Sequence, residues 1–209
     1  MPSLEVLLAF AAATAVFAYI PGPALLYTAA QTLARGRRAG FMAAAGIHLG
    51  CYAHVIAAAF GLSAVFRHVP ELYAALKIAG ALYLVWLGIG MLRARADGTE
   101  TPAIAPRSAR RAFIDSVVVE LLNPKVAIFF IAFLPQFVDP QASFPVWLQF
   151  LILGTVVNFA FSSADVVTVL AASTIMTKLR SGGHVRRLVE RIGGAVMIGL
   201  GVKLAADRT

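Results

Sequence analysis

Long apolar runs separated by short polar segments follow one another along the whole chain. Six of these runs are long enough to cross a bilayer, because a membrane-spanning helix needs about 20 residues. They are Leu4 to Leu33, Gly40 to Phe66, Glu71 to Leu92, Ala112 to Leu134, Val146 to Met176 and Leu188 to Ala206. The strands of a membrane barrel are shorter, about 10 residues, and alternate in polarity. The pattern therefore predicts an all-α integral membrane protein with six transmembrane helices.

The composition excludes an ordinary soluble domain. Of the 209 residues, 60% are hydrophobic and 13% are charged, whereas about 25% are charged in a typical soluble domain. Six spans use most of the chain, so no solvated basic domain remains through which the net charge of +8 would bind nucleic acid. Cys51 is the single cysteine, which excludes a disulfide framework and a CxxC motif. The predicted surroundings are therefore membrane lipid, and the number of copies in the assembly is left open.

Basic residues are distributed unequally between the two predicted sides of the membrane. Three loops on one side carry Arg35, Arg37, Arg38, Arg93, Arg95, Arg107, Arg110, Arg111, Lys178, Arg180, Arg186, Arg187 and Arg191. The opposite side, which includes both termini, carries only Arg67, Lys203 and Arg208. Because cytoplasmic loops are enriched in Lys and Arg, both termini are predicted to lie outside the cytoplasm.

A hydrophilic stretch divides the chain into two sets of three predicted spans. The predicted parts are a first repeat at 1–93, a flexible cytoplasmic linker at 94–111 and a second repeat at 112–209. Prolines interrupt the first span at Pro21 to Pro23 and the fourth at Asn123 to Lys125. An odd number of spans per repeat inverts the second copy, and paired broken helices in inverted halves are typical of a transporter site near the midplane. Prolines that merely kink the two helices are the structural alternative.

Each break leaves backbone groups without helical partners, which a ligand can satisfy. The half-helix after Pro23 presents free N–H groups and a positive dipole end, which suit the carboxylate of an amino acid. In the second break Asn123 can donate and accept hydrogen bonds, and Lys125 adds a cation that could alternatively snorkel or pair with a carboxylate. The expected substrate-binding residues at the breaks are Pro21, Gly22, Pro23, Asn123, Pro124 and Lys125.

Asp165 lies deep in the fifth predicted span, where an acidic side chain costs about 2.5 to 3.5 kcal/mol. At 100° per residue it shares one arc of the helix with Thr155, Asn158 and Ser162, which predicts a polar stripe facing the bundle interior or a cavity. A carboxyl group there can load and release a proton, so Asp165 is the predicted proton-coupling residue, and Asn158 is added to the predicted substrate site. Binding of the substrate's amine, an Asp–Lys pair and a structural polar cluster are the alternatives.

Two further acidic residues lie in the fourth predicted span. Glu120, one turn before Asn123, is the second acidic candidate for the substrate site. Asp115 lies beside Arg110 and Arg111 near the predicted cytoplasmic edge, where an interfacial ion pair is expected.

The second predicted span places His48, Cys51 and His54 within about a third of the helix circumference. Imidazole and thiolate are ligands for zinc, copper or nickel, so a metal-ion exporter that also uses Asp165 is an alternative. Three ligands on one helix complete no coordination sphere, and packed or hydrogen-bonded side chains are the simpler interpretation. A membrane-embedded enzyme with Asp165 and His54 as acid and base is a further alternative, although a nucleophile is not recognisable. No resident metal or cofactor is predicted.

Four stretches resemble a known family in their residues and in their order. They are Pro21-Gly22-Pro23 with Leu25-Leu26, Gly36 to Gly40 (GRRAG) with Gly46, Gly50 and His54, Ala75 to Leu84 (ALKIAGALYL) with Trp86-Leu87-Gly88, and Leu121 to Lys125 (LLNPK) with Phe129-Phe130 and Phe133 to Phe137. Together they resemble the LysE/RhtB family of amino-acid exporters, the lysine exporter and homoserine/threonine resistance proteins. The resemblance implies a six-helix exporter of amino acids or related metabolites in the bacterial inner membrane, driven by the proton or ion gradient.

The chain departs from the family's pattern at two positions. Glu120 stands where the family more often has a neutral polar residue, and His48 stands where an apolar residue is more usual. An extra carboxylate in the cavity would favour a cationic substrate, whereas Lys125 would suit the carboxylate of any amino acid. The resemblance therefore implies no single substrate.

Overall fold

A computed structural model of the chain describes residues 4–64 and 109–180, together with single positions between 75 and 92 and between 191 and 202. The regular elements within the two continuous segments are all helical. They are α1 (Leu4–Tyr19), α2 (Pro23–Ile56), the π-helical η1 (Ala57–Leu62), α5 (Ala109–Leu121), α6 (Pro124–Ile128), the π-helical η2 (Phe129–Phe133), the 3-10 helix η3 (Leu134–Phe137) and α7 (Val146–Arg180). Apart from these single positions, the third and sixth predicted spans lie outside the described residues, as does most of the predicted linker.

Several helices in the described segments are long and apolar enough to cross a membrane. Pro23–Leu62 and Val146–Ala172 meet this criterion alone, and Arg110–Leu121 with Pro124–Phe137 meets it as a pair bent by 41°. The shorter α1 is also apolar, so the first broken span consists of α1 and the first part of α2. The structure thus has the apolar helices that the hydrophobic runs predict for a membrane protein.

The helices break where the prolines predict. Pro23 begins α2 and Pro124 begins α6, because proline lacks an N–H and fits the first turn, where that N–H has no helical partner. In the second break Asn123 caps α6, with its side-chain oxygen accepting from the backbone N of Lys125 at 3.2 Å. In the first break Gly22 precedes α2 without any side-chain cap.

The chain turns back at Gly36, between the first and second predicted spans. Gly36 has a φ of 81° and a ψ of 170°, so two helical segments meet within α2 at a conformation that favours glycine. The sequence analysis predicted separate runs ending at Leu33 and beginning at Gly40. The chain is helical on both sides of Gly36, so the predicted loop is a bend at this one residue.

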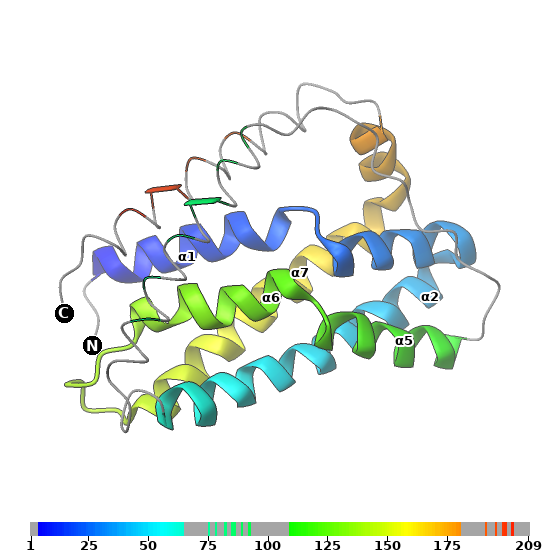
Figure 1. Cartoon of the computed structure of the whole chain (residues 1–209). Coiled ribbons are helices and arrows are strands. Elements are labelled where there is room, and N and C mark those ends of the chain that lie inside the picture. The colour runs from blue at the N-terminus through cyan, green and yellow to red at the C-terminus, as the bar shows by residue number, and fades with distance from the viewer. Residues whose placement is uncertain are drawn as a thin grey trace.

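The two broken helices run in opposite directions. Figure 1 shows α1 and the start of α2 crossing the molecule one way, while α5 and α6 cross it the other way. An inverted repeat requires this arrangement of its first and fourth spans. The complete repeats of three helices also involve residues outside the described ones, so they remain a prediction.

Aromatic side chains form the core that joins α1 to the second broken helix and α7. Phe17 of α1 contacts Phe129 of η2, with ring centroids 4.6 Å apart, and Phe129 also packs against Phe161 of α7 at 5.3 Å. Tilted and edge-on rings at these separations are favourable arrangements for aromatic pairs. This cluster packs α1 against η2 and α7.

Glycines allow α2 to pack closely against α5. A Cβ at Gly46 would collide with Ser116 and with the backbone of Phe113, and a Cβ at Gly50 would lie 2.9 Å from the Cβ of Glu120. Small residues permit such close approach of membrane helices, where van der Waals packing is a main source of stability. The contact holds Glu120 against the second half of α2.

Candidate functional site

The two breaks lie next to each other in the structure. Lys125, just after the second break, donates a hydrogen bond from Nζ to the backbone carbonyl of Ile20 in the first break, at 2.6 Å. These residues are 105 positions apart in the chain. The predicted proximity of the two breaks is therefore present, and it is made by a side chain of one break and the backbone of the other.

Gly22 makes this contact sterically feasible. A Cβ at Gly22 would lie 2.8 Å from Cδ of Lys125, closer than real Cβ atoms approach. Its φ of −137° and ψ of −178° are extended values that any residue adopts, so the need for glycine here comes from space and not from backbone conformation. The lysine stem lies directly on the backbone of the first break.

A small cavity lies between the breaks, α2 and α7. Its described lining residues are Ala18, Gly22, Ala24, Leu25, Ile47, Glu120, Asn123, Lys125, Val126, Phe161 and Asp165. The cavity volume is about 20 Å³, enough for about one water molecule. Its walls must therefore move apart before anything of amino-acid size can enter.

Five of the predicted site residues line this cavity, namely Gly22, Glu120, Asn123, Lys125 and Asp165. The three predicted prolines, Pro21, Pro23 and Pro124, are not among the described lining residues; Pro23 and Pro124 instead occupy the first turns of their helices. The prolines therefore shape the site, while their neighbours provide its polar groups.

Aromatic rings surround the ammonium group of Lys125. Nζ lies 4.9 Å from the ring centroid of Phe17 and 5.9 Å from that of Phe161, distances at which a ring face attracts a cation. Within the described part of the chain, Lys125 makes no ion pair with Glu120 or Asp165. Pairing with a carboxylate was one alternative for Lys125, and the structure gives its ammonium group a carbonyl and two rings instead.

Asp165 is buried on α7, with 2% of its surface exposed. Its Oδ1 accepts a hydrogen bond from Oγ1 of Thr28 at 3.2 Å, and Thr28 lies shortly after the first break. Thr32, one turn further, donates from Oγ1 to the Thr28 carbonyl at 2.7 Å. Thr28 is a residue that the sequence analysis missed, although polar Thr28, Gln31 and Thr32 recur with helical spacing in an apolar run.

Glu120 is the second carboxyl group of the cavity and has 1% of its surface exposed. Nδ2 of Asn123 donates to Oε2 of Glu120 at 3.0 Å. His54 Nε2 lies 3.0 Å from the backbone carbonyl of Glu120. The departure from the family's pattern at Glu120 therefore lies within the site.

The polar stripe of the fifth predicted span faces α2. Asn158 donates from Nδ2 to the His48 carbonyl at 3.1 Å, and Ser162 Oγ lies 2.6 Å from Nδ1 of His48. Oδ1 of Asn158 is buried and has no hydrogen-bond partner among the described residues. The prediction that the stripe faces the bundle interior is confirmed, and Asn158 lies in the interface with α2 rather than among the described lining residues of the cavity.

The possible metal ligands are directed to different partners. His48 Nδ1 lies 2.6 Å from Ser162 Oγ, His54 Nε2 lies 3.0 Å from the Glu120 carbonyl, and Cys51 is buried in the hydrophobic core. Among the described residues, no three His, Cys, Asp or Glu side chains are placed to hold a metal ion together. Nothing in this geometry supports the metal-exporter alternative.

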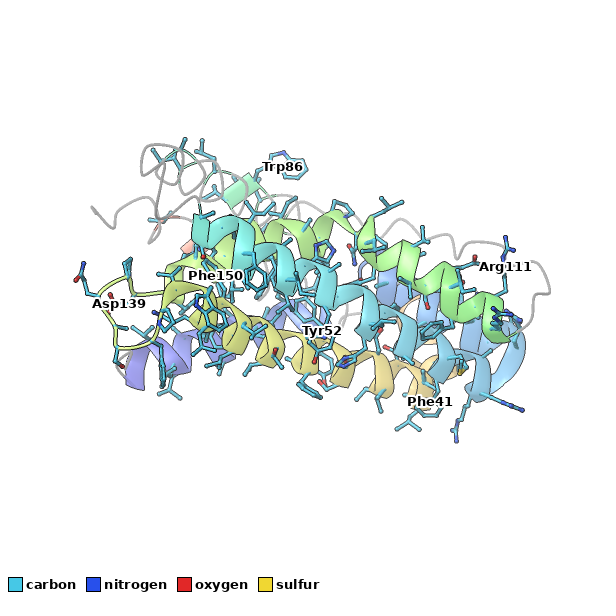
Figure 2. The ribbon with its side chains drawn as sticks, turned by 90° about the horizontal axis from the view of Figure 1, so that it is seen from below. Phe41, Tyr52, Trp86, Arg111, Asp139 and Phe150 are labelled. Atoms are coloured by element: carbon cyan, nitrogen blue, oxygen red, sulfur yellow. The ribbon has the colours of Figure 1, made fainter. Side chains whose placement is uncertain are left out.

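The two ends of the bundle differ in charge. Arg111 Nε lies 3.4 Å from Oδ1 of Asp115, which confirms the predicted ion pair beside the start of α5. Figure 2 shows Arg111 at one end of the bundle and Asp139 at the opposite end. In Figure 1 the bend of α2, which carries Arg35, Arg37 and Arg38, lies at the same end as the start of α5.

The comparisons with known proteins agree with one another over most of the chain. The family model described as LysE type translocator matches residues 15–208. A protein of Pseudomonas aeruginosa named only as an uncharacterized membrane protein is 34% identical over 199 residues, covering 89% of this chain and 88% of the relative. No solved structure matches the chain.

Two other relatives have names that state a transported compound. The leucine efflux protein of Klebsiella pneumoniae is 29% identical and covers 89% of this chain and 88% of its own length. The homoserine/homoserine lactone efflux protein of Salmonella typhimurium is 30% identical and covers 90% of both chains. The family resemblance read from the sequence motifs is thereby confirmed: the chain belongs to the LysE type translocator family of membrane transporters.

Proposed function

We propose that this chain exports an amino acid or a closely related metabolite across the bacterial inner membrane. Its family and the names of two relatives, for efflux of leucine and of homoserine and its lactone, support this function. These names point to transport and not to an enzyme. Leucine and homoserine share an α-ammonium group and a carboxylate, so a site that recognises these two groups serves both amino acids, whereas homoserine lactone keeps only the ammonium group.

The observation that carries the proposal is the meeting of the two breaks beside two buried carboxyl groups. Lys125 bridges the breaks at Ile20, and Glu120 and Asp165 line the same cavity. The proposed substrate-binding residues are those predicted from the sequence, Pro21 to Pro23, Asn123 to Lys125, Glu120 and Asn158. Asn158 contributes from the adjoining interface when the cavity widens.

The start of α2 provides the proposed site for the substrate's carboxylate. Ala24 and Leu25 line the cavity in the first turn of α2, and the first helical hydrogen bond of this segment is from Leu26 N to Gly22 O, at 3.0 Å. Their N–H groups therefore have no helical partner, and α2 has no side-chain cap. An anionic group is favoured at such a helix end.

Transport then proceeds by alternate opening of the two sides of this cavity. Because the cavity volume is about 20 Å³, the two inverted repeats, 1–93 and 112–209, must rock or gate around the breaks to admit the substrate. The basic end of the bundle faces the cytoplasm in this proposal, with both termini outside.

Asp165 is the proposed site of proton coupling. It is buried at the cavity, and its described hydrogen-bond donor is the neutral hydroxyl of Thr28. A carboxyl group in such surroundings can take a proton from the outer side and release it to the cytoplasm as the cavity alternates, which drives export by exchange with the proton gradient. Substrate-amine binding by Asp165 is the alternative role.

Efflux from vesicles tests the proposal. Purified protein in proteoliposomes preloaded with labelled leucine or homoserine should release label several-fold faster than protein-free liposomes. Release should accelerate further when the solution outside the vesicles is made more acidic than the lumen. Equal release from both kinds of vesicle, across a panel of the common amino acids, would overturn the assignment.

A further inference from the structure

The ammonium group of Lys125 occupies surroundings that form a site for a cation. Nζ donates to the Ile20 carbonyl at 2.6 Å and lies over the rings of Phe17 and Phe161. Carbonyls at the C-terminal end of a helix lack helical partners and carry partial negative charge, as at Ile20 after α1. Ring faces attract cations as well. Phe17 lies in α1, Ile20 directly follows α1, and Phe161 lies in α7, whereas the ammonium group belongs to a lysine of α6.

The two carboxyl groups of the cavity are hydrogen-bonded to other side chains. Glu120 is hydrogen-bonded by Asn123 and Asp165 by Thr28, and among the described residues neither forms an ion pair with Lys125. The lysine stem crosses Gly22 to reach the carbonyl instead. Lys125 thus fills space that the small cavity would otherwise offer to a ligand.

The geometry points to an ammonium subsite formed by the Ile20 carbonyl with the rings of Phe17 and Phe161. Lys125 occupies this subsite in the absence of substrate. The α-ammonium group of the substrate displaces it. This inference rests on the proposed function, because it names the group of the exported amino acid that the subsite binds. The released Lys125 then pairs with the substrate's carboxylate.

This exchange selects for zwitterions. An α-amino acid supplies both an ammonium group for Ile20 and a carboxylate for the displaced Lys125. A simple amine leaves the displaced lysine without an anion, and a simple carboxylic acid leaves the carbonyl without a donor. Each such deficit leaves a polar group unsatisfied in a dry site.

Truncation of Lys125 tests the subsite without any transport assay. Lys125→Ala removes three carbons and the nitrogen, so propylammonium restores the missing atoms. Lys125→Leu keeps the stem as far as Cδ, so methylammonium restores the rest. In Lys125→Met the side chain fills the stem and leaves no room for an alkyl group, which makes it the matched control.

The melting temperature in detergent should rise by about 3 °C or more with saturating propylammonium for Lys125→Ala and with methylammonium for Lys125→Leu. The wild type and Lys125→Met should not respond, and neutral propanol should have no effect on any variant. Equal responses of wild type and variants, or no response of either truncated variant, would overturn the subsite. Two variants with different ligands keep the test decisive if one of them does not fold.

A competition assay then connects the subsite to the substrate. In the wild type, 3-methylbutylamine should compete with labelled leucine for efflux at least about 10-fold more weakly than unlabelled leucine does. The ratio should be smaller in Lys125→Leu, where no lysine has to be displaced and only the start of α2 still recognises the carboxylate. Alkylammonium binding without any amino-acid efflux would refute the proposed function but not the subsite. Efflux in which 3-methylbutylamine and leucine compete equally in the wild type would refute the exchange of Lys125 for substrate but not the function.

Discussion

The two breaks satisfy their helix ends in opposite ways. At the second break Asn123 caps α6 and its amide donates to Glu120, so the start of α6 is satisfied by a side chain of the break itself. At the first break Gly22 offers no cap, and the Ile20 carbonyl takes its hydrogen bond from Lys125 of the other break. The start of α6 is thus capped by its own break, whereas the start of α2 has no side-chain cap and the end of α1 takes its partner from the other break.

This difference assigns the two breaks complementary tasks. A binding site must contain polar groups that can exchange one partner for another, and the uncapped start of α2 and the Ile20 carbonyl give the first break backbone groups of this kind. The second break brings charged and amide side chains on a fixed helix start. In the proposed mechanism the first break therefore receives the substrate, and the second provides the groups that respond to it.

The largest expected effect comes from replacing Asp165, whose carboxyl group accepts a hydrogen bond from Thr28, shortly after the first break. In Asp165→Asn the amide preserves size and should retain fold and insertion, because it costs less to bury than a charge. Gradient-driven efflux should fall by about 100-fold, equivalent to about 2.7 kcal/mol, while exchange of substrate down its own gradient continues. The measurement is labelled efflux against counterflow in the same vesicles.

The two modes of transport separate the roles of Asp165. Loss of both modes would replace proton coupling with binding of the substrate's amine. Unchanged gradient-driven efflux would exclude both roles and leave Asp165 with a structural one.

The next largest effect is expected from a methyl group at the first break. Gly22→Ala places a Cβ where Cδ of Lys125 lies 2.8 Å away, so the lysine must leave the Ile20 carbonyl. Efflux should fall by about 10-fold with little change in membrane insertion. Gly61→Ala is the matched control, because a Cβ there meets nothing within 4 Å among the described surroundings. Equal activity of the two variants would show that the lysine contact is unimportant.

Removing the cap of the second break should affect stability more than recognition. Asn123→Ala deletes the cap of α6 and the amide that donates to Glu120, a loss of about 1 to 2 kcal/mol in the free energy of unfolding. Thermal unfolding in detergent measures it, with Gln141→Ala in the exposed loop before α7 as the control. A melting temperature equal to that of the wild type would mean that the second break is not held by its own side chain.

The smallest effect is expected at Thr28. Thr28→Val keeps the shape of the side chain and removes the hydroxyl that donates to Asp165 at 3.2 Å, which costs about 1 kcal/mol. Thr28→Ser, which keeps the hydroxyl, should restore most of the lost stability and the wild-type efflux rate. Failure of serine to restore either would indicate that packing of the methyl group, and not the hydrogen bond, matters at this position.

Much of the fold was predictable because its causes are local. Proline cannot donate within a helix, so Pro23 and Pro124 mark both breaks in the sequence. Asp165 and Glu120 could be found because an acidic residue in an apolar run needs an explanation. Length and hydrophobicity likewise predicted the helices that the structure describes.

The rest depended on contacts between distant segments. Nothing in the sequence distinguishes Phe17 and Phe161 from other aromatic residues of apolar spans, and Thr28 resembles any threonine on a helix. The contact between Lys125 and Ile20 involves a backbone carbonyl, which every residue possesses, so no residue type identifies it. Only the packing of α1 against α6 and α7 shows that these groups meet.

The central claim is that the two breaks form one site in the membrane, with Lys125 on the Ile20 carbonyl when no substrate is bound. Solid-state NMR of protein in lipid bilayers tests it directly, through the dipolar coupling between lysine ¹⁵Nζ and isoleucine carbonyl ¹³C. A close contact should be present in the wild type, absent in Lys125→Met and lost on saturation with the amino acid that the efflux assay identifies. A wild type without this contact, or a contact that the transported amino acid leaves unchanged, would contradict the account.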